Sequence, residues 1–129
     1  MKMRLLMLLF FVPLLHAELP PSAYEAMQAK APEYFNIEIL RVDVALGETP
    51  TEQRVQLVAL ITKVLRSASG AKPNEIINII YNVKEHPRGW AGPGPVPIPR
   101  EKERTVAYLK KLDVGDFEPA AGRMTFTNF

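Results

Sequence analysis

The chain has 129 residues, contains no cysteine and carries a formal net charge of +2 at neutral pH. Lys2 and Arg4 supply that excess, so the chain from Glu18 onward has 14 basic and 14 acidic residues. The lack of cysteine excludes disulfides, thiolate metal sites and cysteine nucleophiles. A neutral chain without a basic stripe also lacks the charge that binds nucleic-acid phosphates, so no nucleic-acid partner is expected.

The first seventeen residues have the layout of a secretory signal peptide. The basic start is followed by an apolar run, Leu5–Leu15, and by Ala17 at the predicted cut. The run has eleven residues, too few to cross a membrane, and Pro13 interrupts it. Leu15 is larger than the residue usually found at its position, so the exact cleavage site stays open. We expect a periplasmic or secreted protein of 112 residues, and the missing cysteines favour a bacterial envelope.

Residues 18–33 are predicted to form a leader and a short helix. Ser22 and Glu25 have the spacing of a capping box, in which the two side chains satisfy amides of the first turn. Tyr24, Met27 and Ala31 share one face, so we expect that face to pack on the rest of the protein. No later segment reaches the length of a membrane span, because the longest apolar run after the signal peptide is only Leu57–Ile61.

Three segments alternate apolar and polar residues as strands do. In residues 34–46 the apolar set changes parity after Ile39, which predicts a β-bulge and a curled strand. Residues 53–67 could form either a helix, which would start near Pro50, or a strand. The β-branched residues favour the strand, and put Val55, Leu57, Ala59 and Ile61 on one face. Ile76–Val83 is the clearest strand and forms a hairpin with it across the turn at 67–74.

The C-terminal third has weaker patterns. Thr105–Leu112 fits a strand or a helix end, Val114–Gly122 fits a loop, and Arg123–Phe129 alternates again as a strand would. These elements predict a mainly β fold, a small antiparallel five-stranded barrel over residues 34–129 that is preceded by the short helix. Ile77, Ile79, Tyr81 and Leu57 are expected inside this barrel.

Several short motifs resemble those of a known class of small barrel proteins. They are S-x-S-G-x-K-P-x-E-x-I-x-I-x-Y from Ser67 to Tyr81, G-W-x-G-P from Gly89 to Pro93, and P-A-A-G from Pro119 to Gly122 with Phe126 after it. Together they resemble small exported bacterial barrels of the OB-fold type, similar to netrin-like modules and the inhibitory domain of tissue inhibitors of metalloproteinases. The resemblance implies the fold alone, because those inhibitors place an N-terminal cysteine on the metal and this chain has none.

Catalytic and metal-binding patterns are weak. Ser67, Ser69, His86, Asp113 and Asp116 supply the residue types of a catalytic triad, but the chain has no G-x-S-x-G elbow. A structural role explains these residues more simply: the serines shape a turn and His86 is a solvated loop residue. No catalytic residue, metal site or cofactor is therefore assigned.

Two carboxylates, Glu101 and Glu103, lie in a run of alternating charge, which is typical of a solvated face. His86 is the one histidine after the signal peptide, so a site with several histidine ligands is not available within one chain.

The loop from His86 to Pro99 is the most informative segment. It holds the only tryptophan, Trp90, and prolines at every second position, which favour an extended polyproline-like course. Trp90 either contacts a ligand or plugs one end of the barrel, and the flanking glycines allow both. The candidate binding residues are Trp90, Pro93, Pro95, Val96, Pro97 and Ile98, with Val96 and Ile98 expected on an exposed contact edge.

These observations predict a non-catalytic exported binding or assembly module that uses the Trp90 loop and a barrel face. Its expected partner is another envelope protein. Two other functions stay open: a small periplasmic hydrolase that uses His86, and a structural accessory subunit whose proline loop docks on a larger protein. Convergence of His86, a serine and an acid on one pocket would favour the hydrolase.

Overall fold

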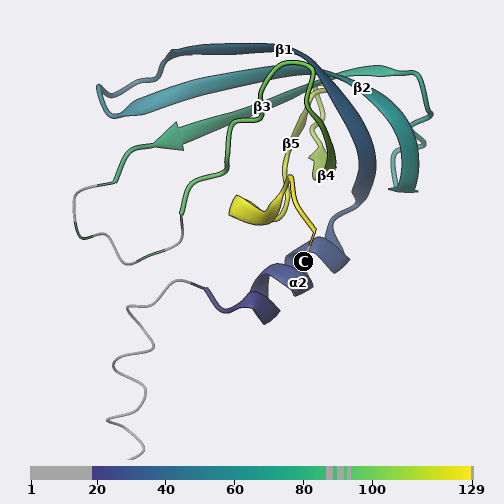
Figure 1. Ribbon diagram of the computed structural model, residues 1–129, viewed down its shortest axis with the longest axis horizontal. Coiled ribbons are helices and arrows are strands. Elements are labelled where there is room, and N and C mark those ends of the chain that lie inside the picture. The colour runs from purple at the N-terminus through teal and green to yellow at the C-terminus, as the bar shows by residue number, and fades with distance from the viewer. Residues whose placement is uncertain (1–18, 87–88, 90–91, 93, 129) are drawn as a thin grey trace, which may run out of the picture.

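The computed structural model describes residues 19–86, 89, 92 and 94–128, which fold into a closed β-barrel with one short α-helix (Figure 1). The order around the barrel is β1-β2-β3-β5-β4, and β4 pairs back onto β1. The predicted mainly β class, the five-stranded barrel and the short helix are confirmed. The strands are β1 (Glu33–Leu46), β2 (Glu52–Ser67), β3 (Ile76–Lys84), β4 (Arg104–Lys111) and β5 (Phe117–Pro119).

The prediction that the barrel is antiparallel throughout is wrong at one junction. β3 and β5 run parallel and pair at Ile79 and Phe117, whereas the other four strand pairs are antiparallel. The barrel therefore closes between β3 and β5 through a single residue pair. Beyond Ile79 the two strands separate.

The fifth strand lies elsewhere than predicted. It is Phe117–Pro119, within the segment that was expected to be a loop, and it is too short to show a period. The segment that was predicted to alternate as a strand from Arg123 onward instead begins within a 3₁₀ turn, η1 (Gly122–Met124). Thr125 stabilises this turn, because its hydroxyl donates to the Gly122 carbonyl oxygen at 2.7 Å and accepts from the Ala121 amide at 3.2 Å.

The predicted bulge in β1 is confirmed. Ile39 pairs with Ala59 and Arg41 pairs with Val58, so Leu40 is the extra residue and points outward. The register also shifts twice in β2, where Thr62 and Leu65 are extra. Each extra residue bends its strand and increases the local twist, which is how two long strands curl around a narrow barrel. β2 itself is a strand and not a helix, with the inward face predicted from its pattern.

The barrel interior is filled by side chains at alternating positions. Leu57 and Ile79 are completely buried and Ile77 nearly so, as predicted, while Tyr81 is only half-buried. The Phe35 and Phe117 rings meet edge to face with centroids 5.9 Å apart, and Phe126 from the C-terminal segment joins the same core. The proline-rich segment adds Val96 and Ile98 to this core.

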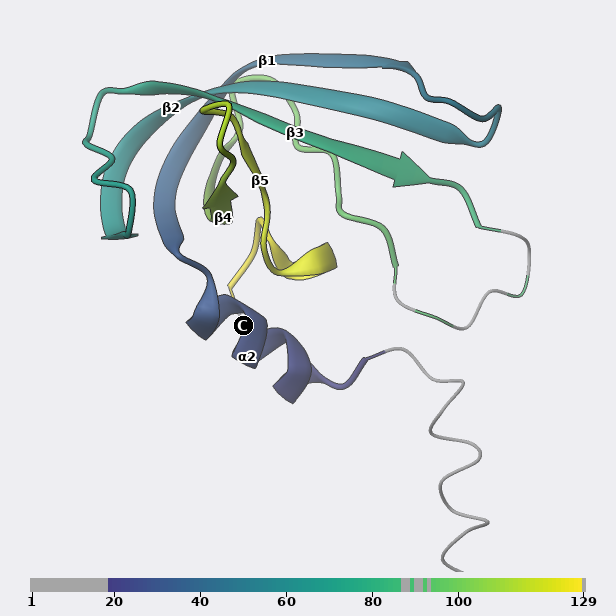
Figure 2. The ribbon, with the colours of Figure 1, turned by 180° about the vertical axis from the view of Figure 1, so that it is seen from behind.

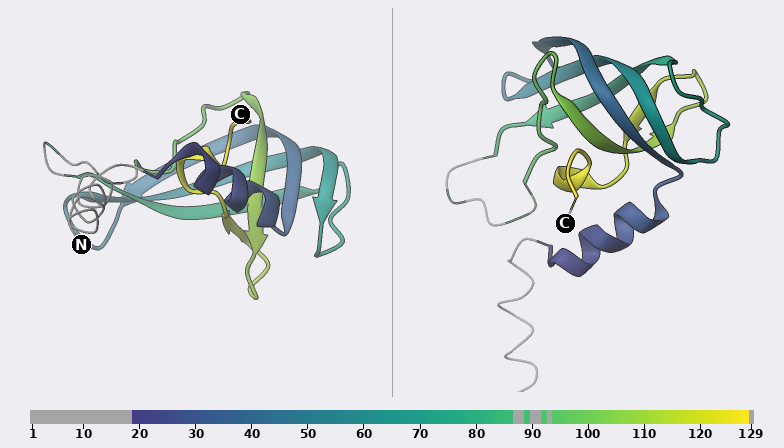
Figure 3. Two further views of the ribbon diagram at one scale, coloured as in Figure 1. Left: turned by 90° about the horizontal axis from the view of Figure 1, so that it is seen from below. Right: turned by 45° about the vertical axis from the view of Figure 1, so that its right-hand side comes forward.

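The helix α2 (Pro21–Lys30) lies beside the C-terminal segment at one end of the barrel (Figure 3). It begins at Pro21, and no side chain caps it, so the predicted capping box at Ser22 is wrong. A proline at the first helical position sets the required φ without needing a cap. The predicted packing face is confirmed, because Tyr24 is buried and Met27 is half-buried. Gln28 fastens the tail by donating through Nε2 to the carbonyl oxygens of Met124 and Thr127 at 2.9 and 2.8 Å.

Three strands continue past the barrel at the opposite end. β4 pairs with β1 only over Glu33–Glu38, but β2 pairs with β1 as far as Leu46 and with β3 as far as Lys84. We refer to residues 41–46, 52–56 and 80–84 as the tip sheet; it projects from the barrel in both views of the ribbon (Figures 1 and 2). The hairpin turn between β1 and β2 requires a glycine at position 47, because a Cβ there would lie only 2.8 Å from Cγ of Glu52.

Candidate functional site

The proline-rich segment crosses the inner face of the tip sheet. Val96 and Ile98 are half-buried against the barrel core, while Pro95 and Pro97, which alternate with them, are exposed. The expectation that Val96 and Ile98 form an exposed contact edge is therefore wrong. An extended backbone places successive side chains on opposite sides, and the two branched residues take the apolar side. Trp90 and Pro93 lie outside the described residues.

Tyr81 anchors this segment to β3. Its hydroxyl donates to the carbonyl oxygen of Pro97 at 2.7 Å. Burial raises the pKa of the Tyr81 phenol far above its usual value, so the hydroxyl keeps the proton that it donates at any physiological pH. The ring also packs against Phe126, with centroids 6.2 Å apart. The exposed prolines are thus held in place from below by a residue of the tip sheet.

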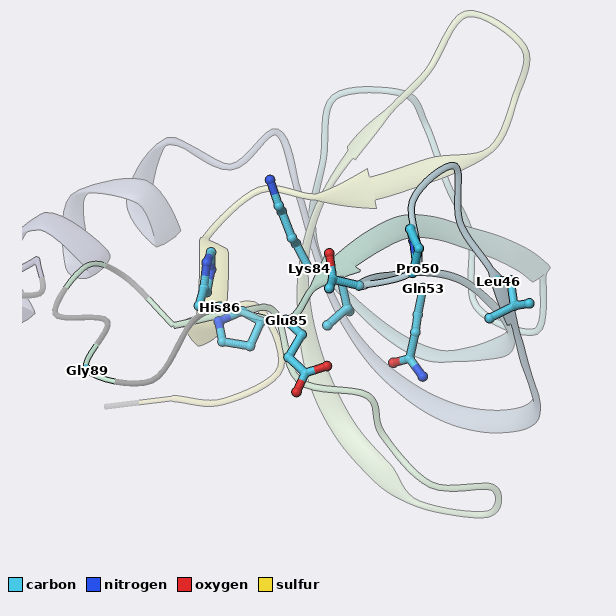
Figure 4. Close-up of a pocket in the computed structure, with 10 residues that line it drawn as sticks. Leu46, Pro50, Gln53, Lys84, Glu85, His86 and Gly89 are labelled. Atoms are coloured by element: carbon cyan, nitrogen blue, oxygen red, sulfur yellow. The ribbon is translucent and has the colours of Figure 1, made fainter.

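A hollow of about 600 Å³ opens beside this segment, and we name it the tip hollow. Leu46, Pro50 and Gln53 line it from the β1–β2 hairpin, Lys84 lines it from the end of β3, and His86 and Pro95 line it from the chain after β3. Figure 4 shows Leu46 at one end of this row of side chains and His86 at the other. Leu46 is 85 % exposed, and Gln53, its partner across the β1–β2 ladder, lines the tip hollow with it.

The residue types of a triad do not meet in the tip hollow. His86 lies there with Glu85 and Thr51, but the lining includes neither Ser67 nor Ser69. Those serines precede β3 and His86 follows it, so nine residues of extended strand, about 30 Å, separate them. The described residues therefore give no support to the alternative function, a hydrolase that pairs a serine with His86.

The two serines instead surround a buried carboxylate that sequence patterns did not identify. Glu33, at the start of β1, is 1 % exposed. Its Oε1 accepts from the hydroxyls of Ser67 and Ser69 at 2.5 and 2.8 Å, and its Oε2 accepts from the amides of Ala68 and Ser69, both at 3.1 Å. Four donors compensate the lost hydration of the carboxylate, so the S-x-S-G motif is explained as a structural cradle.

An aromatic cluster lies at the same end of the barrel as Glu33. The rings of Tyr34 and Tyr108 stack with centroids 4.3 Å apart, and the Arg66 guanidinium lies 5.6 Å from the Tyr34 ring centre. The Tyr108 hydroxyl donates to Oδ1 of Asn128 at 2.6 Å. Burial, and secondarily the neighbouring Tyr34, raises the pKa of Tyr108 to about 12. Arg66 also donates to the carbonyl oxygens of Gln28 and Ala31, so the cluster joins α2 to the barrel.

Within the described ranges, no group of three or more histidine, aspartate or glutamate side chains is arranged to hold a metal ion. Over the same residues, no helix has both the length and the apolar character needed to cross a bilayer. The chain was also compared with known proteins. No family model, no curated protein and no solved structure matches it.

Proposed function

We propose that this protein is an exported, non-catalytic binding module that docks on another envelope protein through the tip hollow and the exposed prolines beside it. The observation that carries the proposal is Leu46, a large apolar side chain that is exposed and lines the tip hollow. Exposed apolar groups with a polar surround are typical of protein-binding surfaces. Gln53, Lys84 and Glu85 provide that surround.

The barrel supports the proposal through its architecture. A strand order of β1-β2-β3-β5-β4 with β3 and β5 parallel is the arrangement we expect of an OB-like barrel. Such barrels bind ligands through the loop between the first two strands. Pro50 and Thr51 of that loop line the tip hollow. The lack of net charge after the signal peptide favours a protein partner over a nucleic acid.

The exposed prolines limit the entropy lost on binding. Pro95 and Pro97 have fixed φ angles, and the Tyr81 hydrogen bond holds the backbone carbonyl of Pro97. A partner therefore meets a surface that is ordered before it arrives. Trp90 belongs to the proposal through its sequence position alone, between Gly89 and Pro95, which both line the hollow.

The export half of the proposal rests on residues 1–17. We expect the full chain, expressed with a C-terminal tag in a bacterial host, to be recovered from the periplasm with Glu18 as its first residue. Intact chain that begins at Met1 in the cytosol would contradict export.

The binding half is tested with the same purified protein. Leu46→Arg places a charge in the tip hollow, and Val114→Arg is the matched control, because Val114 is 80 % exposed in the turn between β4 and β5. We expect the wild type and Val114→Arg to capture the same envelope proteins. We expect Leu46→Arg to capture at least about tenfold less of them. Equal capture by all three proteins, or none by any, would reject the tip hollow as the docking surface.

A further inference from the structure

One edge of β3 has no strand beside it for half its length. β2 pairs with all nine β3 residues, but on the other edge the only paired residue is Ile79, which meets Phe117 of β5. From Ile80 to Lys84, no strand of the described part of the chain lies against that edge. Figures 1 and 2 both show the arrowhead half of β3 extending beyond β5 and β4.

The two free edges of the tip sheet differ in their protection. On β1, Arg41 and Asp43 form an ion pair with 2.9 Å between Nε and Oδ2, and Oε1 of Glu101 accepts from the Val42 amide at 3.4 Å. Charged side chains of this kind keep an edge from pairing with another chain. The β3 edge reads Ile-Tyr-Asn-Val-Lys and carries one charge, at its end. It lacks the protection that β1 has.

A groove of about 630 Å³, the edge groove, runs along this edge. Its floor is formed by Val55, which is completely buried, and by the half-buried Tyr81. Val96 lines it from the proline-rich segment, and Leu112 and Pro119 line it from the chain around β5. Arg54, Gln56, Asn82 and Glu118 complete the lining, so the groove offers apolar contacts next to polar and charged ones.

We infer that the Ile80–Lys84 edge of β3 receives an extended segment of the partner polypeptide, which adds a strand to the sheet. This rests on the proposed function and specifies its ligand class. Only a polypeptide in the β conformation offers backbone donors and acceptors at the spacing of a strand edge. Five residues of edge span about 17 Å, and alternate side chains of the added strand enter the edge groove.

A single strand fits this site better than a second copy of the whole protein. Leu112 and Pro119 line the groove from the chain around β5, so a molecule that approaches the β3 edge meets these residues as well. A slender extended chain enters the groove, whereas a second barrel would bring its own β2 and β3 against these residues. A dimer whose formation is lost on Leu112→Arg would overturn the inference in favour of a second copy.

The probe is a library of random twelve-residue peptides displayed on phage and selected on the purified full-length protein. The best binder is then synthesised in three forms: unmodified, and N-methylated at either the odd or the even residues of its core. In an added strand only alternate amides point at β3. We expect one methylated form to lose affinity by about tenfold or more and the other to stay within about threefold of the unmodified peptide.

Protein variants locate the binding. Leu112→Arg obstructs the edge groove, and Val114→Arg in the same turn is its matched control. We expect the first to abolish peptide binding and the second to retain it, with slowed hydrogen exchange of amides in Ile80–Lys84 when the peptide is bound. Equal loss or equal retention by the two methylated forms, no enriched peptide, or indifference to Leu112→Arg would overturn the inference.

The two proposals fail in different ways. If the tip hollow is not the docking surface, Leu46→Arg captures envelope proteins as the wild type does, while Leu112→Arg still abolishes peptide binding. If no strand is added at β3, Leu46→Arg reduces the capture of envelope proteins, while the two N-methylated forms of the selected peptide bind equally well. Circular dichroism of each arginine variant verifies that the barrel is folded before its binding is interpreted.

Discussion

The two ends of the β1–β2 ladder are stabilised in opposite ways. At the closed end, β1 has a strand on both sides, and the Glu33 carboxylate accepts four hydrogen bonds from the turn after β2. At the tip sheet, β1 and β3 are joined only through β2, and Leu46 is exposed. The closed end therefore holds a strand flanked on both sides and a buried polar network, while the tip sheet exposes a large apolar side chain on the same ladder.

The largest expected effect comes from breaking the closed barrel at its single β3–β5 pair. Ile79→Asp buries a carboxylate with no partner where the barrel closes, and we expect it to cost about 4 kcal/mol or more and unfold the protein. Ile76→Asp is the control, because it lies on the same strand but is 64 % exposed. Thermal unfolding followed by circular dichroism measures both. An Ile79→Asp protein that melts like the wild type would show that this residue does not face the core.

A smaller effect is expected from the Glu33 cradle. Glu33→Ala leaves two serine hydroxyls and two backbone amides without their acceptor in a buried site, which we expect to cost about 3 kcal/mol. Glu48→Ala in the exposed hairpin turn of the tip makes the same substitution and should change stability by less than about 0.5 kcal/mol. Urea unfolding gives both values. Equal costs at the two sites would remove the proposed difference between the ends.

The smallest effect is a pH dependence at the closed end. Burial raises the pKa of Tyr108 to about 12 in the folded protein, whereas an unfolded tyrosine ionises near 10. The folded state therefore holds the proton more tightly, so its stability is constant below about pH 10 and falls as the pH rises towards 12. Tyr108→Phe should make this decline shallower, and Tyr81 supplies the part that remains. Urea unfolding between pH 9 and 12 measures the slope; an identical slope in Tyr108→Phe would contradict the assignment.

The elements that sequence patterns predicted are those in which side-chain period and burial coincide. β1, β2 and β3 are long, each has one buried face, and the parity change after Ile39 marked the bulge at Leu40. β5 was missed because three residues carry no period, and its parallel pairing follows from chain connectivity that no local pattern records. The tail was misread because Met124, Thr125 and Phe126 pack around a 3₁₀ turn.

The candidate site was predictable only in part. Alternating prolines correctly indicated an extended segment, but which side of that segment is buried depends on Tyr81, sixteen residues away in the chain. Glu33 and Ser67 are thirty-four residues apart, and nothing in either local sequence links them. The free edge of β3 is a property of the neighbours that a strand lacks, and these are set by the whole barrel.

The bulge at Leu40 gives β1 two independent phases. Before it, odd-numbered residues face the core; after it, even-numbered residues lie on that side of the sheet, where Val42 pairs with Leu57 and packs against the core. The end of this hairpin, Ala45 and Leu46 with their partners Arg54 and Gln53, can therefore be exchanged as a cassette, provided that the bulge is kept, because none of these four residues is buried. The same device makes the tip a natural place to graft a foreign recognition hairpin onto an otherwise untouched scaffold.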